Sequence, residues 1–278
     1  MIGAIIGDIA GSTYEFHSIK TKDFPLFAPG SNTTDDSLMS IAVASALMQT
    51  GEGGDFKASV VSSMRQIAAK YPCPMGGYGG RFRHWLVSPH PRPYGSFGNG
   101  SAMRVSPCGE VAATLDEALE LAKQSAEVTH NHPEGLKGAE ATAVAVFLAR
   151  TGKSKNEIKD YIIKHYYPLD FTIDGIRETY QYNETCQDTV PQALEAFFES
   201  TDFEDAIRNA ISIGGDSDTL AAITGSVAEA YYGVPADLRK LAYAFLDERL
   251  YYILLEFEER YPAKTEEKQG VARRLCFR

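Results

Sequence analysis

Apolar residues recur at spacings of three and four along most of the chain, the pattern of helices with one buried face. Strict alternation of apolar and polar residues, the pattern of a half-buried strand, is scarce. Thr114 and Ser154 are each followed three positions later by glutamate, as in a capping box, and Pro133 stands where a first helical residue is expected. We therefore predict an all-α fold, with helices near 38–50, 55–69, 114–128, 132–150, 154–166, 188–200, 202–212, 217–232 and 236–260.

Two further regions are read from their glycines. Gly3, Gly7 and Gly11 would form one smooth face of a helix, suited to close packing, although glycine and isoleucine also fit a strand followed by a turn. We favour the helix. Residues 71–110 are rich in glycine and proline, so we expect mostly loop there. A loop this long inside a compact domain is more often functional than idle.

Length and composition narrow the class of protein. The 278 residues allow one or two domains, but no linker or repeat divides them, so we predict a single compact multi-helix domain over residues 1–278. The net charge of -10 argues against general nucleic-acid binding and against binding to an anionic membrane surface. No apolar run has the length of a membrane span, and the pattern is compatible with a monomer.

The cysteines and the N-terminus indicate the compartment. Cys73, Cys108, Cys186 and Cys276 are far apart, which favours neither a zinc site nor a disulfide framework. The first residues lack the basic start of a signal peptide, and Asp8 interrupts their short apolar run. Free thiols in a cytoplasmic protein are the simplest interpretation.

Two acidic clusters stand at predicted helix starts. The stretch TTDDS contains Asp35 and Asp36, and the stretch GGDSDT contains Asp216 and Asp218. Each cluster alone would be read as a helix cap, because Ser, Thr and Asp commonly serve there. If the two helix starts converge, four carboxylates share a small volume and need a positive partner. Carboxylate and hydroxyl oxygens suit Mg²⁺ or Mn²⁺, and the number of ligands fits two ions better than one.

The loop GSFGNGS, residues 95–101, has a physical use of its own. Its three glycines, Gly95, Gly98 and Gly100, would let backbone N–H groups approach a diphosphate and form an anion-binding nest. The alternative is a plain tight turn, since Asn-Gly commonly makes one.

Five motifs in order resemble those of the ADP-ribosylglycohydrolases, a helical, dinuclear-magnesium family that includes the dinitrogenase-reductase-activating glycohydrolase. The resemblance runs from residue 2 to about 233, with weaker support from CQDTVPQALEAFF (186–198), and the last 45 or so residues carry no motif. The motifs are GDIAGSTYE (7–15), TTDDSLM (33–39), GSFGNGSAMR (95–104), THNHPEG (129–135) and GGDSDTLAAITGSVAEAYYG (214–233).

The resemblance implies roles for particular residues. It implies that two Mg²⁺ or Mn²⁺ ions are held by Thr34, Asp35, Asp36, Asp216, Asp218 and Thr219. Glu15 matches an acidic residue on the family's mobile flap, and Glu15 or Asp35 would act as the base. Without the resemblance, Glu15 would be read as an ordinary surface glutamate.

The same resemblance implies how a substrate binds. ADP-ribose would contact Ser96, Phe97, Gly98, Asn99, Gly100, Ser101 and His130. An aromatic side chain such as Phe97 could stack on a ring of the ligand. His132 is expected to fix the turn before the helix at Pro133, and Asp8 is expected to bond backbone groups near the site.

The function that follows is hydrolysis of the glycosidic bond between ADP-ribose and an acceptor, which releases ADP-ribose. Two alternatives from other classes remain at this point. One is a two-metal phosphohydrolase acting on a nucleotide, because clustered aspartates also suit phosphoryl transfer. The other is a non-catalytic ADP-ribose-binding or structural protein on the same scaffold. The acceptor is not readable from the sequence.

Overall fold

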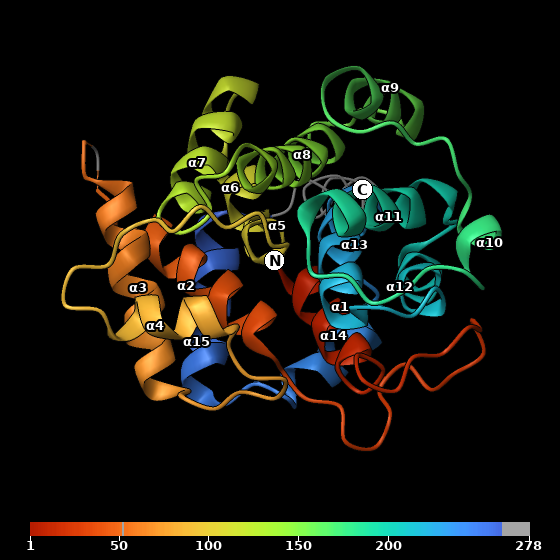
Figure 1. Ribbon diagram of the computed structural model, residues 1–278, viewed down its shortest axis with the longest axis horizontal. Helices are drawn as coiled ribbons and strands as arrows, with labels where there is room; N and C mark the ends of the chain where they lie inside the picture. Colours follow the sequence, from red (N-terminus) through yellow and green to blue (C-terminus); the bar gives the residue numbers. More distant parts are fainter. Residues whose placement is uncertain (52, 263–278) are drawn as a thin grey trace, which may run out of the picture.

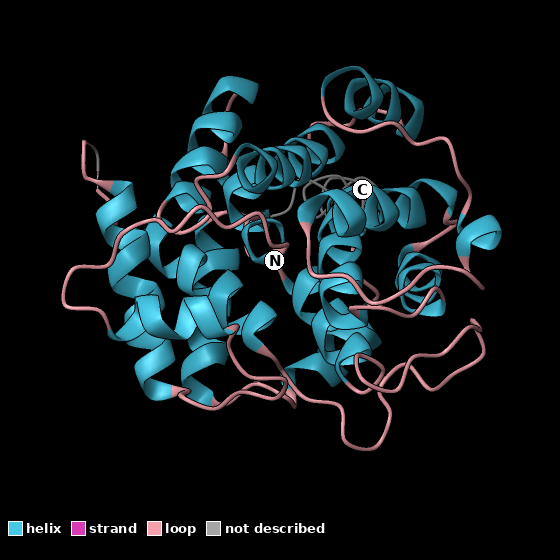
Figure 2. Ribbon diagram, viewed as in Figure 1, coloured by secondary structure: helices cyan, strands magenta, loops and turns pink. Residues whose placement is uncertain are grey.

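The computed structural model describes residues 1–51 and 53–262, and every regular element in those ranges is a helix (Figure 1 and Figure 2). The prediction of an all-α single domain is thus confirmed for this part of the chain. The helices are α1 (Ile2–Ser12), α2 (Asp35–Gln49), α3 (Phe56–Lys70), α4 (Gly80–Val87), α5 (Gly100–Met103), α6 (Ser106–Val111), α7 (Leu115–Glu127), α8 (Pro133–Arg150), α9 (Lys155–His165), α10 (Ile173–Ile176), α11 (Cys186–Glu199), α12 (Phe203–Ser212), α13 (Ser217–Tyr232), α14 (Ala236–Tyr243) and α15 (Glu248–Arg260).

The glycine face predicted for the first segment is real, and it packs on α13. A Cβ atom added at Gly7 would lie 2.0 Å from the backbone oxygen of Ala221, far inside van der Waals contact. On the other helix, a Cβ added at Gly225 would lie 2.2 Å from the backbone oxygen of Gly3. The backbones of α1 and α13 therefore touch directly, and every residue of α1 is buried.

A polar contact fixes how far α1 reaches along α13. The side chain of Glu229, near the end of α13, accepts hydrogen bonds from the Met1 ammonium group and from the Gly3 N–H, both at 2.7 Å. Glu110 also forms an ion pair with the Met1 ammonium group. Both partners are carboxylates beside the positive end of a buried helix, which is where anions are favoured.

The other helices surround this pair. Figure 1 shows α2, α3, α4 and α15 on the left, α7 and α8 above, and α9 to α12 on the right of α13. The core of α8, α11 and α13 is built largely from small and aliphatic residues that are almost fully buried. The N-terminal ends of α2 and α13 lie close together, since residues from both line one cleft.

The helix predictions hold, with one correction. The sequence predicts one helix over residues 236–260, but the chain turns at 244–247 and forms two helices, α14 and α15. Asp247 starts the second helix, where its carboxylate accepts from the Leu250 N–H at 3.0 Å. Ser154 and Glu157 form the expected capping box. At Thr114 only half of the box is present, because Glu117 reaches the N–H of Ala113 rather than that of Thr114.

The long irregular region contains more structure than its composition indicated. Residues 71–110 are mostly loop, as predicted, but three short helices, α4, α5 and α6, interrupt it. The short helix α10 also went unpredicted. These helices are too short for a periodic pattern to stand out among glycine and proline.

The cysteines of the described residues are free thiols, as the sequence predicts. Cys73 is exposed, Cys108 and Cys186 are buried, and all three are free thiols, whereas Cys276 lies outside the described residues. Within the described ranges, none of the helices combines the length and apolar character needed to cross a membrane.

The backbone contact between α1 and α13 yields a stability prediction. Gly7→Ala adds a methyl group at a place where the nearest atoms belong to the backbone of α13. We expect this clash to outweigh the higher helix propensity of alanine and to lower the free energy of unfolding by about 3 kcal/mol or more. Gly51→Ala is the matched control, because a Cβ there meets nothing within 4 Å. Urea unfolding should show the control within about 1 kcal/mol of wild type. Equal stability of the two variants would contradict the contact.

Candidate active site

A cleft of about 370 Å³ opens where the N-terminal ends of α2, α5 and α13 meet. The turn after α1, the loop 76–79 with the start of α4, and Tyr182 and Glu184 form further parts of its walls. Both predicted acidic clusters face this cleft, since Asp35, Asp36, Asp216, Asp218 and Thr219 all line it. The glycine-rich region, residues 71–110, therefore lines the same cleft as the two acidic clusters.

The start of α2 is capped without help from its aspartates. Thr34 is the N-cap residue, and its hydroxyl accepts from the Asp36 N–H at 3.2 Å. The fully buried Asp8 carboxylate accepts from the N–H groups of Thr34 and Ser37, both at 3.0 Å, and from both hydroxyls. The expected structural role of Asp8 is thus observed. The side chains of Asp35 and Asp36 do not cap the helix; Asp36 Oδ2 receives only a long hydrogen bond, of 3.4 Å, from the Thr34 hydroxyl.

The start of α13 shows the same surplus. Gly214 and Gly215, with φ values of 67° and 79°, turn the chain into the helix, a conformation that favours glycine. Asp216 occupies the N-cap position but makes no capping bond; its carboxylate instead accepts from Asn99 Nδ2 at 2.7 Å. Asp218 accepts from the N–H of Thr219 at 2.9 Å. Capping therefore does not account for Asp216.

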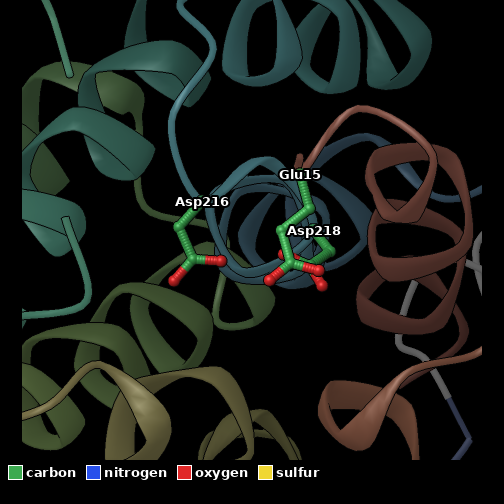
Figure 3. Close-up of side chains that lie close together, drawn as sticks. All are labelled: Glu15, Asp216 and Asp218. Carbon is green, nitrogen blue, oxygen red and sulfur yellow. The ribbon is translucent and has the colours of Figure 1, made fainter. Parts of the chain in front are cut away.

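Carboxylates from distant parts of the chain converge here. One oxygen each from Glu15, Asp216 and Asp218 lie within 4.8 Å of one another, and Figure 3 shows the three side chains pointing together. Glu15 is half-buried in the turn after α1, whereas both aspartates are buried. Glu15 is therefore not the freely exposed side chain that an ordinary surface glutamate would be.

This convergence is electrostatically costly in the absence of a cation. Burial, followed by the charge of Asp218, raises the pKa values of Asp35 and Asp36 well above the ordinary range. The same two causes raise the pKa of Glu15 to about 8. Among the described residues, no lysine or arginine forms an ion pair with these carboxylates.

The donor set fits a hard divalent cation. All the cleft-facing donors in the two clusters are oxygens, which Mg²⁺ and Mn²⁺ prefer. In addition, Asp36 Oδ1 is buried and has no hydrogen-bond partner among residues 1–51 and 53–262. A buried carboxylate oxygen without a partner is rare, and a bound ion is one way to satisfy it.

The glycine loop faces the cleft only in part. Ser96, Gly98, Asn99 and Gly100 line it, in agreement with their predicted position. The N–H of Gly98 donates to Ser96 Oγ and that of Asn99 donates to the Glu184 carbonyl, so these two are not free to bind an anion. The loop therefore offers fewer backbone donors than its three glycines indicated.

Two predicted contact residues do not line the cleft. Ser101 is fully buried, and its hydroxyl donates to the Gly135 carbonyl at 2.7 Å. Phe97 is 41% exposed and packs its ring against that of His132, with 5.2 Å between ring centroids. Thr34 is also absent from the lining, because its side chain is buried behind the start of α2.

Of the two histidines, His132 has the expected structural role and His130 lines the cleft. His132 caps α8, where its Nδ1 accepts from the Glu134 N–H at 3.1 Å. His130 lines the cleft, and its Nδ1 lies 2.7 Å from Thr129 Oγ1, which itself accepts from Arg104 at 2.9 Å. Burial, followed by the charge of Arg104, lowers the pKa of His130 well below its ordinary range, so its imidazole is neutral near pH 7.

Several cleft residues were not predicted from the sequence. They are Phe16, Tyr78, Arg81, Tyr94, Arg104, Tyr182 and Glu184. The glycine-rich region around Tyr78 and Arg81 did signal a functional loop. Tyr182 and Glu184 lie in an ordinary polar segment between α10 and α11, and no local pattern marks them.

Fold and site together define a class: all-helical proteins in which aspartates from two helix starts and a glutamate meet at one cleft. Comparison with known proteins gives the family. The family model for ADP-ribosylglycohydrolase matches residues 1–266, so the chain belongs to the ADP-ribosylglycohydrolase family.

Individual relatives agree with this assignment. In an alignment of 312 positions, the chain is 25% identical to ADP-ribosylhydrolase ARH3 of Homo sapiens. In an alignment of 257 positions, it is 26% identical to ADP-ribosyl-[dinitrogen reductase] glycohydrolase of Rhodospirillum rubrum. Each alignment covers 84% of both chains. A solved structure described as an ADP-ribosylglycohydrolase-related protein complex matches 91% of this chain and 95% of its own, with a TM-score of 0.62 and 23% identity, which supports the fold.

The position of Asp8 generates a prediction about how the site is built. Asp8→Ala would leave two backbone N–H groups and two hydroxyls without their acceptor, so we expect unfolding free energy to fall by about 3 kcal/mol or more. Ser37→Ala removes only one of these donors and should cost about 1 kcal/mol. Urea denaturation measures both. Similar losses for the two variants would show that Asp8 does not anchor the start of α2.

Proposed function

We propose that this protein is a metal-dependent hydrolase that cleaves the glycosidic bond between ADP-ribose and an acceptor and releases ADP-ribose. The observation that carries the proposal is the convergence of Asp35, Asp36, Asp216 and Asp218 with Glu15 at one cleft, in a chain of the ADP-ribosylglycohydrolase family. The reaction adds water to the anomeric carbon of the distal ribose. The bond from that carbon to the acceptor breaks, and the acceptor leaves with a proton.

The proposed cofactor is a pair of Mg²⁺ or Mn²⁺ ions. Five of their ligands would be the cleft residues Asp35, Asp36, Asp216, Asp218 and Thr219. Thr34 would join them by turning its hydroxyl away from Asp8, to which it donates at 2.7 Å in this structure. Such ions would neutralise the buried carboxylates, bind ribose hydroxyls and make a bound water more acidic. The partnerless Asp36 Oδ1 and the absence of a nearby ion-paired lysine or arginine among the described residues support this assignment.

The protein's own residues would position the substrate. Ser96, Gly98, Asn99 and Gly100 would contact ADP-ribose, and Asn99 is itself held by its hydrogen bond to Asp216. His130 is neutral, and it would offer one ring nitrogen to a ligand oxygen in the cleft. Glu15 or Asp35 would accept the proton of the attacking water, since Glu15 lines the cleft beside the proposed metal ligands and Asp35 is one of those ligands.

The proposal does not assign the group from which ADP-ribose is released, and the relatives' names differ in the group that they give. One relative, 29% identical over 148 residues, is named ADP-ribosylarginine hydrolase Tri1, of Pseudomonas putida; it aligns with 49% of this chain. Candidate acceptors for this chain include arginine, serine, an acetyl group and a nucleic-acid end.

A conjugate panel tests the proposed function. The purified protein is incubated with ADP-ribose linked to each candidate acceptor, with Mg²⁺ or with a chelator, and the products are separated by chromatography. We expect free ADP-ribose from at least one conjugate, only when metal is present. AMP or inorganic phosphate would instead identify a phosphohydrolase. Binding of ADP-ribose without turnover of any conjugate would identify a binding protein.

A melting series tests the metal site without any substrate. Asp218→Asn keeps the acceptor for the Thr219 N–H but removes a buried charge, so the metal-free variant should melt at or above the wild-type temperature. Mg²⁺ at 100 times its dissociation constant should stabilise wild type by about 2.7 kcal/mol, or roughly 5–10 °C. The variant should lose most of this gain. Asp170→Asn, at an exposed position, is the control that should keep it. Absence of a Mg²⁺ effect on wild type would rule out the metal site.

A further inference from the structure

Few contacts hold the side chain of Glu15 in place. It sits in the turn after α1, outside any helix, and its carboxylate stands within 4.8 Å of those of Asp216 and Asp218. Ionised carboxylates this close repel one another, and neither aspartate donates a hydrogen bond to Glu15. Glycine at position 76, with φ of 73°, leaves room for the other side of the carboxylate, since a Cβ there would lie 3.0 Å from Glu15 Oε2. The position of Glu15 therefore requires an attractive contact from elsewhere.

That contact comes from Tyr182. Its hydroxyl has one hydrogen, which it shares between Glu184 Oε1 at 2.9 Å and Glu15 Oε1 at 3.4 Å, the longer and weaker branch. Among the described residues, this hydroxyl is the one hydrogen-bond donor that Glu15 has. Phe16, the residue after Glu15, also contacts Tyr182. The two rings are stacked, with 6.4 Å between their centroids and 26° between their planes. The turn after α1 is thus held to the 182–184 segment at both Glu15 and Phe16.

The exposure of these rings points the same way. Phe16 is 66% exposed and Tyr182 is 44% exposed, yet both line the rim of the cleft. A pair of rings this exposed adds little to the stability of the core, so the arrangement is better explained by what it positions than by what it buries. What it positions is the carboxylate of Glu15, beside Asp216 and Asp218.

We propose that Tyr182 is a positioning residue, whose hydroxyl and ring hold Glu15 over the acidic cluster in the geometry that the reaction needs. The inference rests on the proposed function for its kinetic readout. Tyr182 would act through Glu15, so its loss should affect the rate of the chemical step more than the binding of ADP-ribose. Glu184 has a secondary part, because it accepts the shorter of the two hydrogen bonds and orients the phenol.

Tyr182→Phe is the variant that isolates the hydroxyl. The ring keeps its stacking on Phe16, so the fold and the melting temperature should stay as in wild type. With the conjugate that wild type hydrolyses best, we expect kcat to fall by about 10- to 100-fold, because small misplacements of a catalytic group have effects of that size. KM should change by less than about threefold, the signature of an interaction used in the transition state.

Two further measurements make the result decisive. Tyr252→Phe, at a 59% exposed tyrosine of α15, removes a hydroxyl without touching the cleft and should keep the wild-type kcat. Crystal structures of wild type and Tyr182→Phe, both free of metal and substrate, should show the Glu15 carboxylate turned away from Asp216 and Asp218 in the variant alone. An unchanged kcat, or an unmoved Glu15, would overturn the inference. Because the structures need no substrate, they decide the role of Tyr182 even if no conjugate is hydrolysed.

Discussion

The whole arrangement depends on the direct backbone contact between α1 and α13. Because Gly3 and Gly7 lack side chains, the two helices lie closer together than side chains would allow. This contact places the turn that carries Glu15 beside the start of α13, which carries Asp216 and Asp218. Asp8, on the same helix α1, holds the start of α2 through Thr34 and Ser37 and so adds the second acidic cluster.

The site concentrates negative charge that the fold does not neutralise by itself. Buried carboxylates without a cation are costly, and the raised pKa values of Asp35 and Asp36 express that cost. The fold bears it because a large, well-packed helical core surrounds the site. Strain of this kind is common at functional sites, where local stability is exchanged for chemistry.

Much of the fold and part of the site could be predicted from sequence. The helices followed from periodic apolar spacing, and the acidic clusters stood out because four hydroxyl or carboxyl residues exceed what one cap needs. The break between α14 and α15 was not predicted because the apolar pattern continues through it and Asp247 does not stand out among the charged residues around it. Tyr182 and Glu184 were missed because they reach Glu15 only through tertiary packing, which no local spacing encodes. Phe97 and Ser101 could not be placed by motif alone, because adjacent residues of one loop face different ways.

The pairing of α1 with α13 also bears on the order of folding. Met1 and Glu229 touch although they are 228 positions apart. At roughly 5–20 residues per second, a ribosome takes on the order of ten seconds or more to make the chain between them. During that time the apolar first helix lacks α13, its main partner, and the two acidic clusters remain separate. Contacts of such long sequence separation form late and slowly, so the site is assembled only when α13 has docked on α1.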